Sequence, residues 1–124
     1  MNRLTYQLAI LLMFTITSSC ASAKTPDCTS PNAWPAAMAF THLKNDGVIN
    51  NDEFDFNKTL VTRLASEKIG KDLYRQVHLV RFTRKSGESI DAITVNEASN
   101  VECSMSGVDV YLITKHLGDY SKRH

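Results

Sequence analysis

The pattern of apolar positions predicts strands in the second half of the chain. Runs rich in β-branched and apolar residues, typical of strands, occupy residues 59–65, 72–84 and 89–97. The polar turn Lys85-Ser86-Gly87-Glu88 joins the second and third runs, which we expect to form a hairpin. Further strand material lies at 101–105 and 108–114, where Ser106-Gly107 would form a bulge.

One helix is predicted before these strands, from about residue 32 to residue 45. Trp34, Met38 and Thr41 fall on one stripe at helical spacing. Ser30 or Asn32 is a suitable cap, each followed by a proline that fits a first helical turn. Gly47 is a natural stop. We therefore expect an α+β fold: one N-terminal helix packed on a four- to five-stranded antiparallel sheet.

The first 23 residues have the features of a signal peptide. An apolar run at residues 8–16 follows the single charge of Arg3, and Ala21-Ser22-Ala23 matches the pattern that signal peptidase cleaves. The run is about half the roughly 20 residues that a membrane-spanning helix needs. Cys20 leaves open lipidation, although Thr17 stands where lipoproteins usually carry Leu. We expect cleavage near Ala23-Lys24, a single domain over 24–124, and a periplasmic or secreted location without a stable membrane anchor unless Cys20 is lipidated.

Two cysteines remain after this cleavage, Cys28 and Cys103. An even pair in an exported chain predicts a disulfide. The bond would close a loop of about 75 residues, for which chain entropy gives roughly 4–5 kcal/mol of stabilisation. Free thiols, a metal pair and a reactive cysteine are the alternatives, and neither a CxxC spacing nor a neighbouring His favours them.

Charge and composition give no sign of nucleic-acid binding. Removing residues 1–23 removes Arg3 alone among the charged residues, so the 14 basic residues fall to 13 against 13 acidic ones. Proteins that bind nucleic acid usually carry a basic patch or stripe, and none is visible here. We expect no nucleic-acid partner.

No motif for catalysis or for a cofactor stands out either. The four histidines (His42, His78, His116 and His124) lack zinc-binding spacing, and no G-x-S-x-G elbow occurs. The segment from Asp46 to Phe54 resembles the second half of an EF-hand loop, but His42 and Lys44 stand where calcium requires oxygen ligands. We expect neither an enzyme nor a bound metal or cofactor.

The segment of residues 50–56 is the most distinctive surface candidate, because it combines three carboxylates with two aromatic rings. One interpretation buries Phe54 and Phe56 and leaves the acids solvated. The other makes the segment a contact loop for a basic partner, where complementary charge would steer association. Together with the predicted hairpin tip, the candidate partner-binding residues are Asp46, Asp52, Glu53, Asp55, Lys85 and Glu88.

The layout resembles the small bacterial periplasmic immunity proteins, with an order of elements similar to the colicin M immunity group. Cys28, the helix around Trp34 and Cys103 follow one another in the order of that family: cysteine, helix, antiparallel sheet, second cysteine late in the sheet. The resemblance covers most of the chain after residue 23 in layout and carries no motif residue, so it implies a fold and a role but no site.

The leading hypothesis is a periplasmic binding protein without catalytic activity, most simply an immunity protein that inhibits an envelope-targeting toxin. Its partner would be another protein, a toxin or an envelope enzyme. The alternative is a small secreted or envelope accessory protein that binds a ligand or surface component, which would require a deep apolar pocket between helix and sheet. An enzyme with an unrecognised site would instead gather perturbed carboxylates or histidines in a cleft.

Overall fold

The computed structural model describes residues 25–115, 117 and 118. The predicted signal peptide, its cleavage site and Cys20 lie outside these residues, as do His116 and His124. The chain forms an α-helix, α1 (Trp34–Asn45), two short 3₁₀ helices, η1 (Asn51–Glu53) and η2 (Phe56–Lys58), and then four strands. The predicted α+β class is confirmed. In the described part of the chain, no helix is long and apolar enough to cross a membrane.

The four strands form one antiparallel sheet in sequence order. They are β1 (Leu60–Gly70), β2 (Leu73–Thr83), β3 (Ser89–Ala98) and β4 (Asp109–Ile113). The β2–β3 pairing is regular over its whole length, from Tyr74 opposite Ala98 to Thr83 opposite Ser89. Such a meander needs only short connections, which suits a chain of this size.

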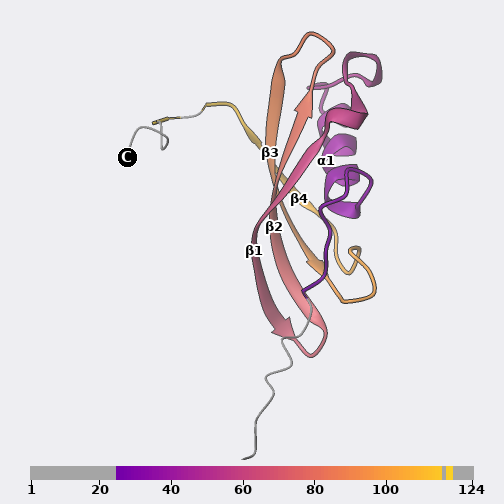
Figure 1. Ribbon diagram of the computed structural model, residues 1–124, viewed down its shortest axis with the longest axis vertical. Coiled ribbons are helices and arrows are strands. Elements are labelled where there is room, and N and C mark those ends of the chain that lie inside the picture. The colour runs from indigo at the N-terminus through magenta and orange to yellow at the C-terminus, as the bar shows by residue number, and fades with distance from the viewer. Residues whose placement is uncertain (1–24, 116, 119–124) are drawn as a thin grey trace, which may run out of the picture.

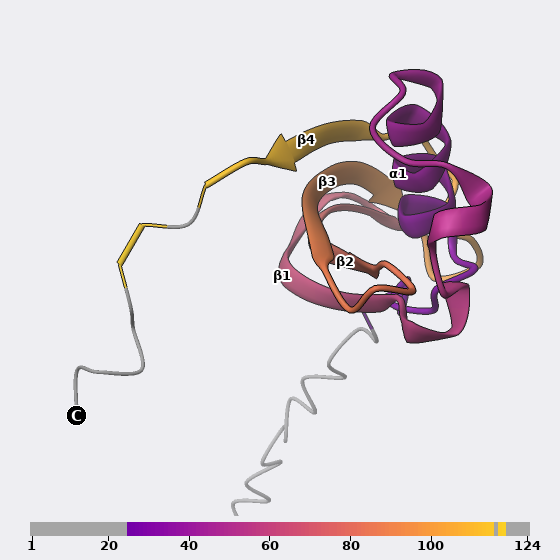
Figure 2. The same cartoon turned by 90° about the horizontal axis from the view of Figure 1, so that it is seen from above.

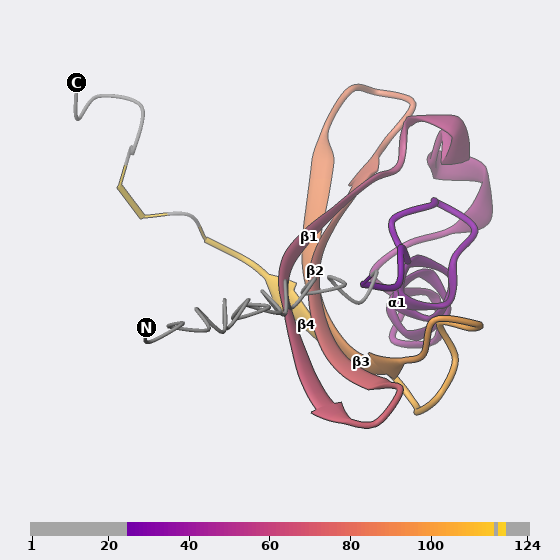
Figure 3. The same ribbon diagram turned by 60° about the horizontal axis from the view of Figure 1, so that its bottom comes forward.

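The sheet curves around α1, which lies on its concave side (Figures 1 and 2). Alternation along β2 determines which side chains face the helix: Tyr74, Gln76, His78, Val80 and Phe82 are buried, and the residues between them are exposed or half-buried. The convex face carries no other described element (Figure 3). The molecule is therefore a two-layer structure with one covered and one open face of the sheet.

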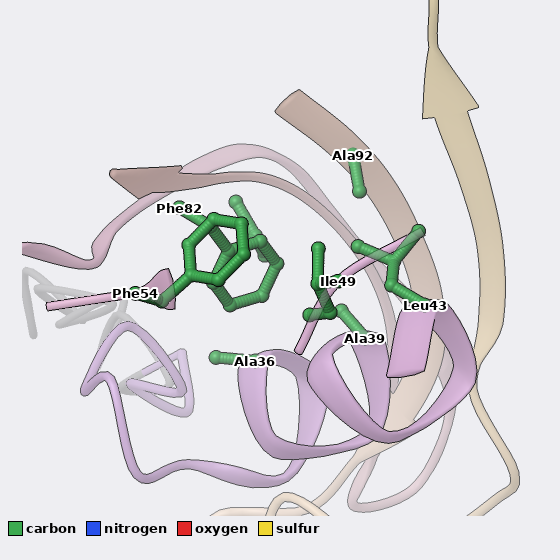
Figure 4. Close-up of a cluster of buried hydrophobic side chains, with 8 residues drawn as sticks. Ala36, Ala39, Leu43, Ile49, Phe54, Phe82 and Ala92 are labelled. Atoms are coloured by element: carbon green, nitrogen blue, oxygen red, sulfur yellow. The ribbon is translucent and has the colours of Figure 1, made fainter. Parts of the chain in front are cut away.

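The hydrophobic core lies between α1 and one half of the concave face. Phe82, Ile49 and Ala92 meet Ala36 and Ala39 of the helix there (Figure 4). The rings of Phe54 and Phe82 pack edge to face, with centroids 6.3 Å apart. Because Ala36 and Ala39 are small, the helix approaches the sheet closely and the aromatic rings fill the remaining space.

The helix agrees with its predicted range except at its start and in its buried face. It begins at Trp34, with Ala33 at the cap position and no side-chain capping bond, so neither Ser30 nor Asn32 caps it. The buried residues are Pro35, Ala36, Ala39 and Leu43, whereas Thr41 of the predicted stripe is exposed. The stop at Gly47 is confirmed: this residue has φ 76°, and Val48 N–H donates to Leu43 C=O at 2.9 Å.

Two strand predictions need correction. β1 continues to Gly70, five residues beyond the predicted end, through a register shift between Arg63 and Ala65. Residues 101–105 are loop, not strand, and the final strand begins only at Asp109. Local hydrogen bonds explain the loop, since Ser99 Oγ accepts from the N–H groups of Val101 and Glu102. The sheet therefore has four strands.

Candidate functional site

Two segments distant in the sequence come together at one end of the molecule. The first is the connection between α1 and β1, and the second is the turn between β2 and β3. Lys85 N–H donates to Glu53 C=O at 2.8 Å, and Asp55 N–H donates to Thr83 C=O at 3.1 Å. We call the residues gathered here the loop–hairpin surface: Asp52, Glu53, Asp55, Phe56, Arg84, Lys85 and Glu88. Five of the six candidate residues from the sequence belong to it.

Arg84 holds the two segments together. Its guanidinium forms an ion pair with Glu53 from the loop and lies 3.6 Å from the carboxylate of Glu88 in its own turn. It also stacks over the buried ring of Phe54, 5.0 Å from the centroid. A planar cation that contacts two carboxylates and a ring fixes their relative positions. The acidic loop is thereby held against the hairpin.

The turn itself has a defined backbone. Arg84 N–H donates to Glu88 C=O at 2.7 Å, and Gly87 N–H donates to Arg84 C=O at 2.8 Å. Gly87 has φ 95°, a backbone conformation that residues with a Cβ atom rarely adopt. The tip that presents Lys85 and Glu88 is therefore held by a tight turn.

The two aromatic rings of the acidic segment have different environments. Phe54 is 6% exposed and belongs to the core, whereas Phe56 is 37% exposed. Phe56 packs edge to face on Phe40 of α1, with centroids 5.7 Å apart. The interpretation that buries both rings is thus right for Phe54 alone, and Phe56 adds an apolar element to the loop–hairpin surface.

Two carboxylates of this surface border a shallow hollow of about 290 Å³, which is lined by Asp52, Glu53, Arg84, Lys85 and Ser86. Asp52, Lys85 and Glu88 are exposed to solvent. Asp46 is the one candidate that the fold places elsewhere: it caps the C-terminus of α1 and borders a different hollow, between α1 and β4. Asp46 is not part of the loop–hairpin surface.

A second cluster, which the sequence did not reveal, is a buried polar layer on the concave face. Gln76 and His78 of β2 lie opposite Asn96 and Thr94 of β3. All four are at most 2% exposed. Five of their polar atoms have no hydrogen-bond partner in the structure: Gln76 Oε1, both ring nitrogens of His78, Thr94 Oγ1 and Asn96 Oδ1.

This polar layer positions the disulfide. Gln76 Nε2 donates to Pro26 C=O at 2.8 Å, two residues before Cys28, and Arg63 donates to the same carbonyl at 3.0 Å. Asn96 Nδ2 donates to the carbonyl of Cys103 at 2.8 Å. Cys28 and Cys103 are bonded, with sulfur atoms 2.06 Å apart. The predicted disulfide is confirmed, and one amide from each central strand holds each of its ends.

His78 is neutral at neutral pH. Burial, together with the nearby charge of Arg63, lowers its pKa from 6.5 to about 4 against the opposing effect of Asp27. The pKa of Asp27 is itself lowered, chiefly by a hydrogen bond from the Thr29 side chain. The buried, neutral imidazole fills space in the polar layer without hydrogen-bond partners. Its protonation is unfavourable in the folded protein, so the free energy of unfolding decreases as the pH falls.

Neither cluster has the composition of a metal centre. Across residues 25–115, 117 and 118, no group of three or more His, Cys, Asp or Glu side chains is placed to hold a metal ion. Comparison of the chain with protein-family models, with curated proteins and with solved structures gave no match.

Proposed function

We propose that this protein is an exported, periplasmic binding protein that acts without catalysis, as an immunity protein that inhibits an envelope-targeting toxin. The observation that carries the proposal is the loop–hairpin surface, where Arg84 fixes two distant segments into one solvent-facing unit. The partner is a protein with a cleft that this end of the molecule enters.

The surface combines the properties that tight inhibitors use. Its segments are held in place before binding, so little conformational entropy is lost on association. Asp52, Lys85 and Glu88 present exposed charges of both signs on this surface, and the ring of Phe56 is 37% exposed. An aromatic anchor within a charged rim gives both affinity and a fixed orientation.

The disulfide supports the exported location. Disulfides persist in oxidising compartments and are rare in the cytosol, and the Cys28–Cys103 bond links the segment before α1 to the loop after β3. A toxin that acts on the envelope would be met in such a compartment. The disulfide and the rigid surface are thus consistent with one role.

The ligand-binding alternative has less support. It requires a deep apolar pocket between helix and sheet, but Phe82, Ile49 and Phe54 occupy that space in the described core (Figure 4). The larger hollows, of about 510 and 590 Å³, lie beside α1 along the segment 106–112 and carry polar as well as apolar linings. They resemble surface grooves more than an enclosed ligand site.

A protection assay tests the proposal. A sensitive bacterial host that expresses the full chain is challenged with purified envelope-acting toxins, beginning with the colicin M class. We expect survival at toxin doses that kill the parent host. The double variant Asp52→Lys with Lys85→Glu reverses two exposed charges on the surface and should abolish protection.

The matched control reverses two charges at the opposite end of β1, with Glu67→Lys and Lys68→Glu, and should protect as well as the native chain. Both double variants keep the net charge. If the native chain protects against no toxin of this kind although it accumulates in the periplasm, the immunity proposal is wrong. If the surface variant protects fully, the binding site lies elsewhere.

A further inference from the structure

The two edges of the sheet differ in how they are protected from pairing. β1 is an eleven-residue edge with two register shifts, and it carries the charged residues Arg63, Glu67 and Lys68. Bulges and charges of this kind prevent one edge strand from pairing with another. The register shifts and charges of β1 therefore hinder its pairing with another strand.

β4, at the other edge, has no register shift in its pairing with β3, and its one charged residue is Asp109 at its first position. Three consecutive large apolar residues are exposed: Tyr111 by 57%, Leu112 by 40% and Ile113 by 39%. Its C-terminal part extends away from the body of the molecule (Figure 2). Within the described residues, no strand pairs with its outer edge. An exposed apolar edge of this kind is a template for another strand.

The sequence of this edge is complementary to itself. Residues 109–115 read Asp-Val-Tyr-Leu-Ile-Thr-Lys. In an antiparallel pair centred on Leu112, Asp109 of each copy lies opposite Lys115 of the other, and Tyr111 lies opposite Ile113. Both Asp109 and Lys115 are exposed. Opposite charges and aromatic–β-branched pairs are favourable cross-strand combinations, and this register places no like charges opposite each other.

We propose that β4 is a homodimer interface, in which the β4 strands of two copies pair antiparallel about a two-fold axis at Leu112. The two sheets then form one continuous eight-stranded sheet. Each dimer contains two Asp109–Lys115 pairs and two Tyr111–Ile113 pairs on the convex face. The interface is isologous, as expected for a closed dimer.

The concave face has room for this arrangement. Val110 and Leu112 line the hollow of about 510 Å³ between α1 and β4. In the proposed register, Leu112 meets Leu112 of the second copy at the mouth of this hollow. Side chains from the second copy thus enter a groove that already exists, and α1 need not move. This interface lies on β4 and is distinct from the loop–hairpin surface.

Charge reversal tests the register directly. The full chain is expressed in a bacterial host, purified from the periplasm and examined by sedimentation. We expect the native protein to dimerise with rising concentration. Asp109→Lys alone places Lys opposite Lys115, and Lys115→Asp alone places Asp opposite Asp109, so each should raise the dimer dissociation constant about tenfold or more. The double variant should restore the dimer, because both pairs re-form with exchanged signs.

Mixing gives a sharper outcome. Equal amounts of Asp109→Lys and Lys115→Asp should form a heterodimer at concentrations where neither variant dimerises alone. Leu112→Cys should also cross-link to its own copy on mild oxidation, whereas Val101→Cys, on the exposed loop after β3, should not. A native protein that stays monomeric at every concentration overturns the proposal. So does a dimer that both single variants leave intact, and so does a monomer whose edge is occupied only by a strand of a different protein.

Discussion

The concave face of the sheet has an apolar half and a polar half. In the apolar half, Val80, Phe82 and Ala92 pack against α1. In the polar half, Gln76, His78, Thr94 and Asn96 are buried between this apolar half and the buried pair Tyr74 and Ala98, and the segment 26–28 with its disulfide lies over the polar residues. The same two strands supply both halves, so the backbone is not the cause of the difference.

Two different kinds of interaction stabilise the two halves of this small fold. Burial of apolar area stabilises the first half and depends little on solution conditions near neutral pH. Directed hydrogen bonds and one covalent bond hold the second, where unpartnered polar atoms oppose folding. The polar half should therefore respond to redox state and pH, and the apolar half to side-chain volume.

Loss of the disulfide is expected to have the largest effect. Replacing Cys28 and Cys103 by Ala should lower the free energy of unfolding by about 4.5 kcal/mol, because the unfolded chain is no longer constrained. Urea unfolding followed by fluorescence of the single tryptophan, Trp34, measures it; the indole N–H donates to Ser106 C=O at 2.9 Å. A loss below about 1 kcal/mol would mean that the hydrogen bonds hold the polar half unaided.

Truncation of a core side chain in the apolar half should have the second-largest effect on stability. Phe82→Ala should cost about 4 kcal/mol, since the ring is 1% exposed and its removal leaves a cavity against α1. The same unfolding assay applies. Leu79→Ala is the matched control, from the convex face of the same strand, where the side chain is only half-buried. If both variants lose equal stability, the convex face is covered in solution.

Acidification should weaken the polar half selectively. The pKa of His78 is about 4 in the folded protein and 6.5 in the unfolded chain, so between these values the unfolded chain binds the proton more tightly. Stability is therefore highest above pH 6.5 and falls as the pH drops toward 4. The loss reaches about 3 kcal/mol at most, and unfolding curves recorded at successive pH values measure it.

His78→Gln should remove most of this slope between pH 6.5 and 4. His42→Gln, which removes an exposed imidazole from α1, should leave it in place. Asp27 and Arg63 are the charges that act on His78. Any dependence of stability on pH that remains at lower pH in this variant belongs to carboxylates such as Asp27. A slope that persists undiminished in His78→Gln would show that His78 is not its source.

The sequence predicted the fold class and the helix because their signals are local, and it predicted the disulfide because two cysteines follow residue 23. Gly47 is a common kind of helix stop, and an even pair of cysteines after a predicted signal peptide has a simple interpretation. The exact ends of the helix and strands depend on contacts between residues distant in the sequence. Residues 101–105 are apolar enough for a strand, but the disulfide at Cys103 and the turn around Ser99 hold them as a loop.

The candidate surface was predicted in its parts but not as a whole. Glu53 and Lys85 were both candidates, yet nothing in the sequence indicated that they meet, since 31 residues separate Arg84 from its partner Glu53. Gln76 and His78 were missed for a different reason. Polar residues in a strand suggest solvent exposure, but Gln76 and His78 lie at every second position in step with Tyr74, Val80 and Phe82 and therefore share their buried face.

The smallest expected effect, that of a substitution at Thr94 in the polar half, has the opposite sign. Thr94 is fully buried, and its hydroxyl has no hydrogen-bond partner. Thr94→Val keeps the shape and removes a desolvated polar atom, so the free energy of unfolding should rise by about 1 kcal/mol. Thr62→Val, at an exposed position on β1, should change it by no more than about 0.5 kcal/mol. A loss of stability in Thr94→Val would mean that the hydroxyl is hydrogen-bonded in solution and that the polar half is stabilised by its own network, as the apolar half is by packing.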